Sequence, residues 1–476
     1  MLFNSLQFAI FFVIVYSLYL AFNHKWQNRM LLVASYVFYG AWDWRFLSLI
    51  WISTVLDYYC GIIIHESNDL KKRKLFLFFS IFGNLSILGF FRYFNFFAGN
   101  LQRLFYSTGI SLDPVFLSII LPVGISFYTF QTMSYTIDIY YKKMEPTKKF
   151  FDFALFVAFF PQLVAGPIER AKHLLPQILS PRKLSLNRFY EGCYLIFWGL
   201  FLKIFVADNL ARIVDPIFSS NPPYNGVKVI LALYAFAFQI FGDFAGYSTV
   251  ARGLGKIMGF DIMINFNLPY FATNPSEFWR RWHISLSTWL RDYLYIPLGG
   301  NKKGTFNTYR NLAITMLLGG LWHGAAWTFV LWGAYQGALL IAYRLLAPWL
   351  KLIPEFKSKF FEKIWFIVRV VFFFQLICLG WLFFRARSMT QVFEMLKSIF
   401  LNFELIHGLG LKTVSLQLAF YLWLLLIVQF LQYKKNDLLF ILKSKTYIKA
   451  VFYYVCVFLM FFYGVTVGRQ FIYFQF

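Results

Sequence analysis

The sequence predicts an all-α, polytopic membrane protein, and three observations support this fold class. Of the 476 residues, 59% are hydrophobic and 23% are aromatic, and the mean hydropathy is +0.59. Only 14% of the residues are charged, whereas an average soluble domain carries about 25%. Many apolar runs approach the roughly 20 residues that span a bilayer. One soluble core could not bury so many aromatic side chains, so we expect lipid to surround much of the chain.

Apolar segments follow one another along the chain with short polar breaks. We expect roughly ten to twelve membrane helices from them, with residues 30–64 holding two. Segments that are too short or too polar for a simple span are predicted to be re-entrant or interfacial helices, which protein must bury or which line a watery cavity. No repeat or soluble insertion interrupts the pattern, so residues 1–476 are predicted to form a single membrane domain. The segments are 3–22, 30–64, 75–97, 115–140, 151–166, 189–212, 227–250, 311–346, 366–385, 414–433 and 449–468.

The formal net charge is +24, from 45 basic and 21 acidic residues. In a soluble protein this charge would suggest nucleic acid. Here the cations fall in the breaks between apolar runs, which is typical of cytoplasmic loops beside anionic lipid. We therefore expect contact with the lipid bilayer and none with nucleic acid. A second interpretation remains open, in which some cations receive a polyanionic substrate such as coenzyme A. Several basic breaks flank residues 265–337, so this stretch is predicted to open toward the cytoplasm.

Charged residues within the apolar runs are costly, at about 2.5–3.5 kcal/mol for a charge at the centre of a membrane helix. Asp57 and Asp243 are examples, and we expect some such residues to pair across helices. The four cysteines form no CxxC pair, which argues against a zinc site or a disulfide framework. Four of the six histidines are predicted to be loop or interfacial residues: His24, His65, His173 and His407.

The remaining two histidines lie between Asn265 and Gly337, each beside a tryptophan. Neither His283 nor His323 has an acidic partner nearby in sequence, so we expect no metal site. Read as one helix with 100° between residues, 277–296 has an aromatic face and a polar face. The polar face carries Arg280, His283, Ser287 and Arg291. Two interpretations stay open: an interfacial helix whose arginines touch lipid phosphates, or a cavity wall whose arginines bind phosphate bidentately.

Residues 297–303 are predicted to form a hinge, because Pro297 lacks an amide donor and the following glycines tolerate unusual dihedral angles. His323 is expected about one third of the way along the apolar helix that follows. Glycines on both sides of it would let a backbone or a thin substrate approach closely. A histidine suits general base catalysis near neutral pH. We therefore predict that His323 takes a proton from a hydroxyl that attacks a thioester carbonyl, or that it carries the acyl group briefly itself.

These motifs resemble those of the membrane-bound O-acyltransferases, in particular the bacterial branch that acetylates alginate and peptidoglycan. The matching stretches are 161–170, 241–247, 265–270, 277–283, 291–300, 321–327 and the terminal 471–476. The resemblance covers most of the chain. It implies a ring of membrane helices around a central tunnel, with a catalytic core at about 120–345. It also implies that His323 is the catalytic histidine and His283 the second polar position of the site, with Tyr473 as a candidate relay hydroxyl.

The expected reaction is transfer of an acetyl group from cytoplasmic acetyl-coenzyme A toward a cell-envelope polysaccharide. Arg280, Arg281 and Arg291 are predicted to hold the coenzyme's phosphates. Three further residues are assigned to the donor side: Trp322, Ser287 and Asn311. The resemblance implies a periplasmic acetyltransferase-esterase partner, a location in the bacterial cytoplasmic (inner) membrane, and acetyl-coenzyme A as a substrate with no permanently bound cofactor. The many Lys, Phe and Ile residues hint at an AT-rich genome, which favours peptidoglycan over an alginate-like polymer. Transfer of D-alanine to teichoic acid and a non-enzymatic polysaccharide or acyl transporter are the alternatives.

Overall fold

The computed structural model describes residues 1–110, 116–350, 358–403, 409–465 and 471–472. Within these ranges every regular element is helical, as predicted. Eight helical segments are long and apolar enough to cross a membrane. They are His24–Glu66, Leu70–Ser107, Leu186–Ser219, Gly226–Ile257, Trp327–Leu350, Lys359–Arg385, Leu411–Lys435 and Thr446–Tyr463. The count of roughly ten to twelve membrane helices stays a prediction, as does their arrangement in a ring.

The chain divides into two compact units. Unit 1 consists of Met1–Ile196 and Val250–Met263, and unit 2 of Phe197–Thr249 and Ile264–Phe476. Two helices, α10 (Leu186–Phe201) and α12 (Gly226–Ile257), contribute residues to both. The division describes internal contacts, so the single membrane domain and the catalytic core at about 120–345 stay predictions.

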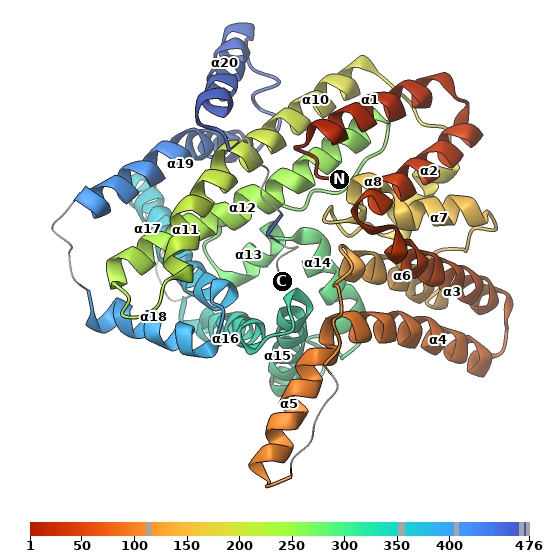
Figure 1. Ribbon diagram of the computed structural model, residues 1–476, viewed down its shortest axis with the longest axis horizontal. Coiled ribbons are helices and arrows are strands. Elements are labelled where there is room, and N and C mark those ends of the chain that lie inside the picture. The colour runs from red at the N-terminus through yellow and green to blue at the C-terminus, as the bar shows by residue number, and fades with distance from the viewer. Residues whose placement is uncertain (111–115, 351–357, 404–408, 466–470, 473–476) are drawn as a thin grey trace. The chain divides into compact units, whose positions relative to one another are not determined.

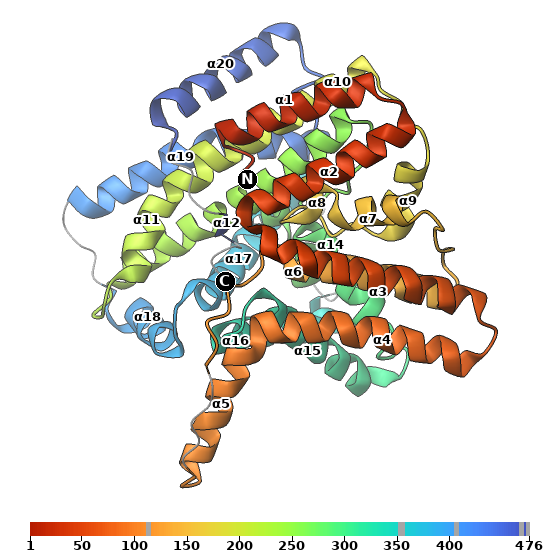
Figure 2. The same ribbon diagram turned by 45° about the vertical axis from the view of Figure 1, so that its right-hand side comes forward.

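Unit 1 begins with helices whose first turns are closed by side chains. Ser5 caps α1 and Asn23 caps α2, each by accepting a hydrogen bond from a backbone N–H of the first turn. A short 3-10 turn, Trp44–Phe46, divides the predicted segment 30–64 into two helices, as expected. Helices α3, α4 and α6 pack side by side (Figures 1 and 2). The helices of this unit up to α10 are α1 (Leu6–Ala21), α2 (His24–Asp43), α3 (Leu47–Glu66), α4 (Leu70–Leu88), α5 (Phe94–Ser107), α6 (Ile125–Tyr140), α7 (Phe150–Ala158), α8 (Phe160–Leu163) and α9 (Ala171–Leu179).

Asp57 is completely buried where α3 packs against α4 and α6. Ser80 Oγ donates a hydrogen bond to one carboxylate oxygen at 2.6 Å, and Asn84 Nδ2 donates to the other at 2.9 Å. The Ser80 hydroxyl lies 2.7 Å from the hydroxyl of Thr136. Asp57 therefore hydrogen-bonds across helices, but the partners shown are neutral side chains of α4 rather than another charged residue of an apolar run. We call these four residues the Asp57 cluster.

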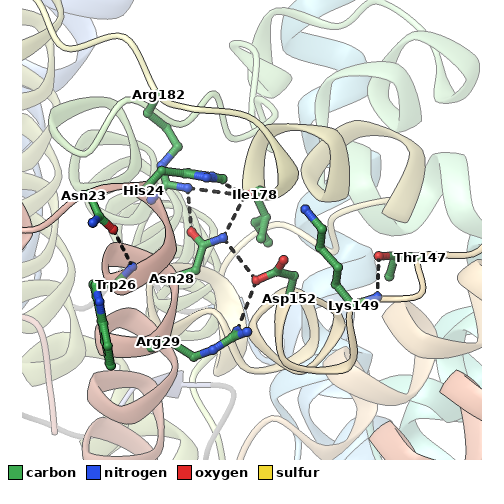
Figure 3. Close-up of polar contacts among 10 residues, drawn as sticks. All are labelled: Asn23, His24, Trp26, Asn28, Arg29, Thr147, Lys149, Asp152, Ile178 and Arg182. Carbon is green, nitrogen blue, oxygen red and sulfur yellow. Dashed lines mark hydrogen bonds and ion pairs between the residues drawn. The ribbon is translucent and has the colours of Figure 1, made fainter.

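A second polar network joins α2, α7 and the end of α9 (Figure 3). Arg182 Nη1 donates to Asn28 Oδ1 at 2.6 Å, and Asn28 Nδ2 donates to Asp152 Oδ1 at 3.2 Å. The Nε2 atom of His24 lies 2.9 Å from the carbonyl oxygen of Ile178. The prediction that His24 is a solvated loop residue is therefore wrong, because α2 begins at this residue and its ring is bonded to the end of α9.

The other peripheral histidines differ from one another. His65 is exposed in the last turn of α3. His173 is half-exposed, and its Nδ1 atom lies 2.7 Å from the buried carboxylate of Glu169. That hydrogen bond raises the pKa of His173 above its ordinary value. His407 lies outside the described residues.

Unit 2 contains the stretch from Asn265 to Gly337, and its helices carry the chemistry-bearing residues. Helices α15 and α16 pack closely against each other, and α16 also packs against α17 (Figure 2). The helices of this unit beyond α10 and α12 are α11 (Asp208–Ser219), α13 (Pro275–Arg281), α14 (Ile284–Leu290), α15 (Gly304–His323), α16 (Trp327–Leu350), α17 (Lys359–Arg385), α18 (Met389–Leu401), α19 (Leu409–Lys435) and α20 (Thr446–Tyr463).

Asp243 on α12 also pairs, but with a cation. Lys203 Nζ lies 2.8 Å from a carboxylate oxygen of Asp243 and 2.8 Å from one of Asp208. The second oxygen of Asp243 accepts a hydrogen bond from the backbone N–H of Ile472 at 2.6 Å. The buried charge of Asp243 thus holds both a lysine and the beginning of the terminal segment.

Candidate active site

The predicted single helix over 277–296 is wrong. The chain forms α13, leaves helical geometry at Trp282 and His283, forms α14, and then makes one π-helical turn at Arg291–Tyr295. The signal for the start of α13 was present in the sequence. Asn274 caps that helix by accepting from the N–H of Glu277, and Pro275 occupies its first position.

The break at 282–283 has a physical cause in the preceding segment. The backbone N–H of Asn267 donates to the carbonyl oxygen of Arg281 at 2.9 Å, and the N–H of Ile284 donates to the carbonyl oxygen of Asn265 at 2.9 Å. The side-chain oxygen of Asn265 also accepts from the hydroxyl of Ser285 at 2.9 Å. These bonds take up backbone groups that a continuous helix would have used internally. Because Asn265 lies far back in the sequence, periodicity within 277–296 cannot reveal them.

His283 occupies the turn between α13 and α14 in a left-handed conformation, with φ 42° and ψ 53°. Such a conformation is uncommon for a residue with a side chain. Its Nδ1 atom caps α14 by accepting from the N–H of Leu286 at 3.2 Å. The ring is completely buried, with the Phe244 ring centroid 4.6 Å away. Burial lowers the pKa of His283 to about 3. The ring is thus neutral at physiological pH, and because Nδ1 accepts a hydrogen bond, the proton is on Nε2.

His323 is the last residue of α15, not a residue one third of the way along a continuous helix as predicted. The apolar segment 311–346 breaks at 324–326, and α16 begins at Trp327. Gly324 lies in the break, where a Cβ atom would overlap the ring of Phe329. The break leaves the buried His323 ring 6.4 Å from that of His283, between ring centroids.

Glycines hold α15 and α16 close together beside His323. A Cβ atom on Gly320 would collide with the carbonyl oxygen of Phe329, and one on Gly333 would collide with that of Met316. The two backbones can therefore approach only because both positions lack a side chain. This contact places Trp332, the residue before Gly333, with its ring centroid 5.0 Å from that of His323.

A cavity of about 510 Å³ lies within unit 2, and His323 is one of its lining residues. The buried part of its lining includes His323, Trp332 and Met316, and the exposed part includes three arginines. These arginines are Arg280, Arg291 and Arg344. The cavity thus combines a buried imidazole with a cationic, solvent-accessible rim. None of the described residues that line it is an aspartate or a glutamate.

Four predicted site residues line this cavity: Arg280, Ser287, Arg291 and His323. Four others do not: Arg281, His283, Asn311 and Trp322. Trp322 is buried with its ring centroid 5.0 Å from that of His323. Tyr473 lies outside the described residues.

Arg281 and Asn311 have structural contacts instead. Arg281 donates two hydrogen bonds to one carboxylate oxygen of Glu277, at 2.9 and 3.0 Å. Burial by itself would raise the pKa of Glu277, but hydrogen bonds from Thr273 and Arg281 hold that pKa below its ordinary value. Asn311 Nδ2 donates to the carbonyl oxygen of Gly300 at 3.0 Å, and so ties α15 to the loop at 296–303. That loop contains the predicted hinge at 297–303. Its place between the π-helical turn and α15 is confirmed, whereas its action as a hinge stays a prediction.

The lining residues that sequence reasoning missed include Trp279, Trp332 and Arg344. Trp279 lay on the segment treated as one helix, and the wrong helical geometry hid its orientation. Trp332 and Arg344 belong to α16, which only the break at 324–326 folds back along α15. A lone cation near the end of an apolar helix was the one signal that could have drawn attention to Arg344.

Among the described residues, no three His, Cys, Asp or Glu side chains are placed to hold a metal ion. The proposal that the protein binds no metal stays a prediction. A buried histidine in a cavity with a cationic rim is suited to proton transfer near an anionic substrate.

Comparisons with known proteins identify the family of the chain. Residues 145–384 match the membrane-bound O-acyltransferase family. A Pseudomonas putida protein named as a probable alginate O-acetylase, AlgI, is 43% identical over 403 residues, covering 84% of this chain and 80% of that protein. A peptidoglycan O-acetyltransferase of Helicobacter pylori is 34% identical over 420 residues, covering 83% and 76%. A teichoic acid D-alanyltransferase of Bacillus subtilis is 28% identical over 277 residues, covering 56% and 69%.

The family match spans the segment that contains both buried histidines and every residue that lines the cavity. Together with eight apolar helical segments, it accounts for a multi-pass membrane enzyme that transfers acyl groups to oxygen. The chain belongs to the membrane-bound O-acyltransferase family.

Proposed function

We propose that this protein transfers an acetyl group from the thioester of acetyl-coenzyme A toward a hydroxyl of a cell-envelope polysaccharide. The observation that carries the proposal is the cavity with buried His323 at one part of its lining and three arginines at its exposed rim. Arginine binds phosphate through a planar, bidentate fork. The rim suits the phosphates of the coenzyme, and the buried part suits its thioester.

His323 is the proposed general base. It takes the proton of the attacking hydroxyl, and the same proton then goes to the departing thiolate, so the transfer consumes no net proton. His283 is proposed as a supporting residue, because it is buried and neutral and its ring lies 6.4 Å from that of His323. Trp322, Ser287, Asn311 and Arg281 are proposed to shape the donor side.

The charge of the cavity favours acetyl over D-alanyl transfer. A D-alanyl thioester carries a free ammonium group, which would be stabilised by a carboxylate. The described lining offers arginines and neither aspartate nor glutamate. We propose that acetyl-coenzyme A is a substrate and that the protein holds no permanently bound cofactor. The donor is proposed to reach the cavity from the cytoplasmic side of a bacterial inner membrane. Lys302 and Lys303, just before α15, support that orientation.

The acceptor polymer is proposed from the relatives. The chain is more similar to the alginate O-acetylases, at 43% identity, than to the peptidoglycan O-acetyltransferase, at 34%. This order is opposite to the one that composition favoured, so both polymers are candidates for the acceptor. An extracytoplasmic acetyltransferase-esterase partner would carry the group onward to the polymer.

Tyr473 is proposed as a relay hydroxyl between His323 and that partner. The two described residues before it support the idea. The backbone N–H of Ile472 donates a hydrogen bond to the carboxylate of Asp243. The Phe471 ring lies 5.7 Å from that of Phe244, and the Phe244 ring contacts His283.

The donor assignment can be tested with the purified full-length protein in lipid nanodiscs. We expect release of coenzyme A thiol from acetyl-coenzyme A, and a loss of about 10²–10⁴-fold in that rate for His323→Ala. The matched control is His65→Ala, which removes an exposed histidine from α3. Thermal unfolding should be similar for the wild type and both variants. Full activity of a folded His323→Ala protein would disprove the proposed role of His323.

A further inference from the structure

Three tryptophans of unit 2 have buried indole nitrogens for which the described residues provide no hydrogen-bond partner: Trp279, Trp332 and Trp381. A buried indole N–H usually finds an acceptor, and an exception in a native structure requires an explanation. Trp279 and Trp332 line the cavity, whereas Trp381 does not. Two of the three tryptophans therefore have side chains on the wall of a space that a ligand can enter.

Trp332 is the donor nearest to the proposed chemistry. Its side chain is 1% exposed, and its ring lies 5.0 Å from that of His323 at an interplanar angle of 86°. The Gly320–Gly333 contact fixes the helix that carries it. Phe384 and Trp381 pack against its ring, with centroids 5.4 and 6.2 Å away, so its orientation is held by neighbours on α17.

The rim arginines are less suited to the same task. Arg280, Arg291 and Arg344 are exposed, and water would weaken a hydrogen bond from any of them to a reacting oxygen. A rigid neutral donor in a dry site needs no rearrangement when negative charge develops beside it, and such preorganised donors contribute strongly to acyl transfer.

We propose that the indole N–H of Trp332 donates a hydrogen bond to the carbonyl oxygen of the acyl thioester and stabilises the oxyanion formed during transfer. This inference rests on the proposed function. The acceptor hydroxyl oxygen bonds to the carbonyl carbon, the C=O electron pair moves to oxygen, and His323 takes the hydroxyl proton. When the C=O bond reforms, the C–S bond breaks and the thiolate receives the proton from His323. Trp332 stays protonated throughout.

The test is the rate of coenzyme A thiol release by the full-length protein in nanodiscs. Trp332→Phe keeps an aromatic ring but removes the N–H, and should lower kcat by about 100-fold with little change in KM, because the bond strengthens only as the oxyanion forms. Replacement of Trp332 by benzothienylalanine, which has sulfur in place of N–H in the same fused rings, should give the same loss. Because the benzothienylalanine variant keeps the shape of the side chain, an equal loss of kcat in it would come from the missing hydrogen bond and not from altered packing.

Trp349→Phe is the matched control. It removes an indole from the same helix, α16, at an exposed position that does not line the cavity. Its kcat should stay close to that of the wild type. Wild-type kcat in the benzothienylalanine variant, or an equal loss in Trp349→Phe, would overturn the inference while leaving the proposed function intact. A wild-type protein that released no coenzyme A thiol would overturn the proposed function and the inference with it.

Discussion

The Asp57 cluster in unit 1 and the cavity in unit 2 are both polar sites buried among apolar helices, but they differ in how their polar atoms are satisfied. One carboxylate oxygen of Asp57 accepts a hydrogen bond from Ser80 and the other accepts one from Asn84, and both donors lie on α4. Along the cavity, the indole N–H groups of Trp279 and Trp332 have no partner among the described residues. A satisfied cluster holds helices together, whereas donors left unsatisfied beside a cavity mark the place where a substrate completes the hydrogen bonding.

Asp57→Ala should give the largest loss of stability, since it leaves the donors of Ser80 and Asn84 buried without their acceptor. We expect a loss of about 2–3 kcal/mol in unfolding free energy, with kcat of the folded fraction unchanged. Chemical unfolding in mixed micelles measures the first quantity and thiol release the second. Asp57→Asn, which keeps one acceptor oxygen, should lose less. A stable Asp57→Ala protein with reduced kcat would mean that the Asp57 cluster serves the reaction rather than stability.

His283 should make the stability of the protein depend on pH. Burial lowers its pKa from 6.5 to about 3 in the folded protein, so between these values the unfolded chain binds a proton that the folded chain does not. Stability should therefore fall as the pH falls below about 6.5, by roughly 1.4 kcal/mol per pH unit at most from this residue. Unfolding measured at a series of pH values should show a shallower slope for His283→Asn. An unchanged slope would mean that His283 is not the buried group responsible.

The rim arginines should affect binding of the donor more than the chemical step. Arg280→Ala, Arg291→Ala and Arg344→Ala are each expected to raise KM for acetyl-coenzyme A by about tenfold, which corresponds to about 1.4 kcal/mol. The same variants should not change KM for acetyl N-acetylcysteamine, a thioester without the coenzyme's phosphates. Arg45→Ala is the control, because Arg45 pairs with Asp43 and does not line the cavity. An equal rise in KM for both donors would argue against phosphate binding at the rim.

Much of the fold could be predicted because its signals are local. Apolar runs of membrane length predicted the helices, and the short turn within 30–64 was expected from the length of that segment. His323 could also be selected as a candidate, since its glycine neighbours are adjacent in sequence. The prediction that two segments form continuous helices was wrong. Both the helix over 277–296 and the helix over 311–346 are broken in the structure.

The break at 282–283 depends on a residue that is distant in sequence. Asn265 accepts hydrogen bonds from the backbone N–H of Ile284 and from the hydroxyl of Ser285. At the break at 324–326, Phe329 occupies the space that a side chain at Gly324 would need. Neither interaction leaves a periodic signal within the segment that it interrupts.

The sequence by itself determined the class of this protein and its apolar helical segments, and it pointed to His323 as the candidate reactive histidine. These properties follow from composition and from patterns within single segments, because burial in lipid is decided by apolar length. Only the tertiary structure decided which side chains share the cavity. It brought Trp332 and Arg344 of α16 to the same wall as His323 and placed His283 and Arg281 elsewhere. The physical reason is that a cavity is formed by packing between helices, through contacts such as Gly320 with Gly333, which no single helix encodes.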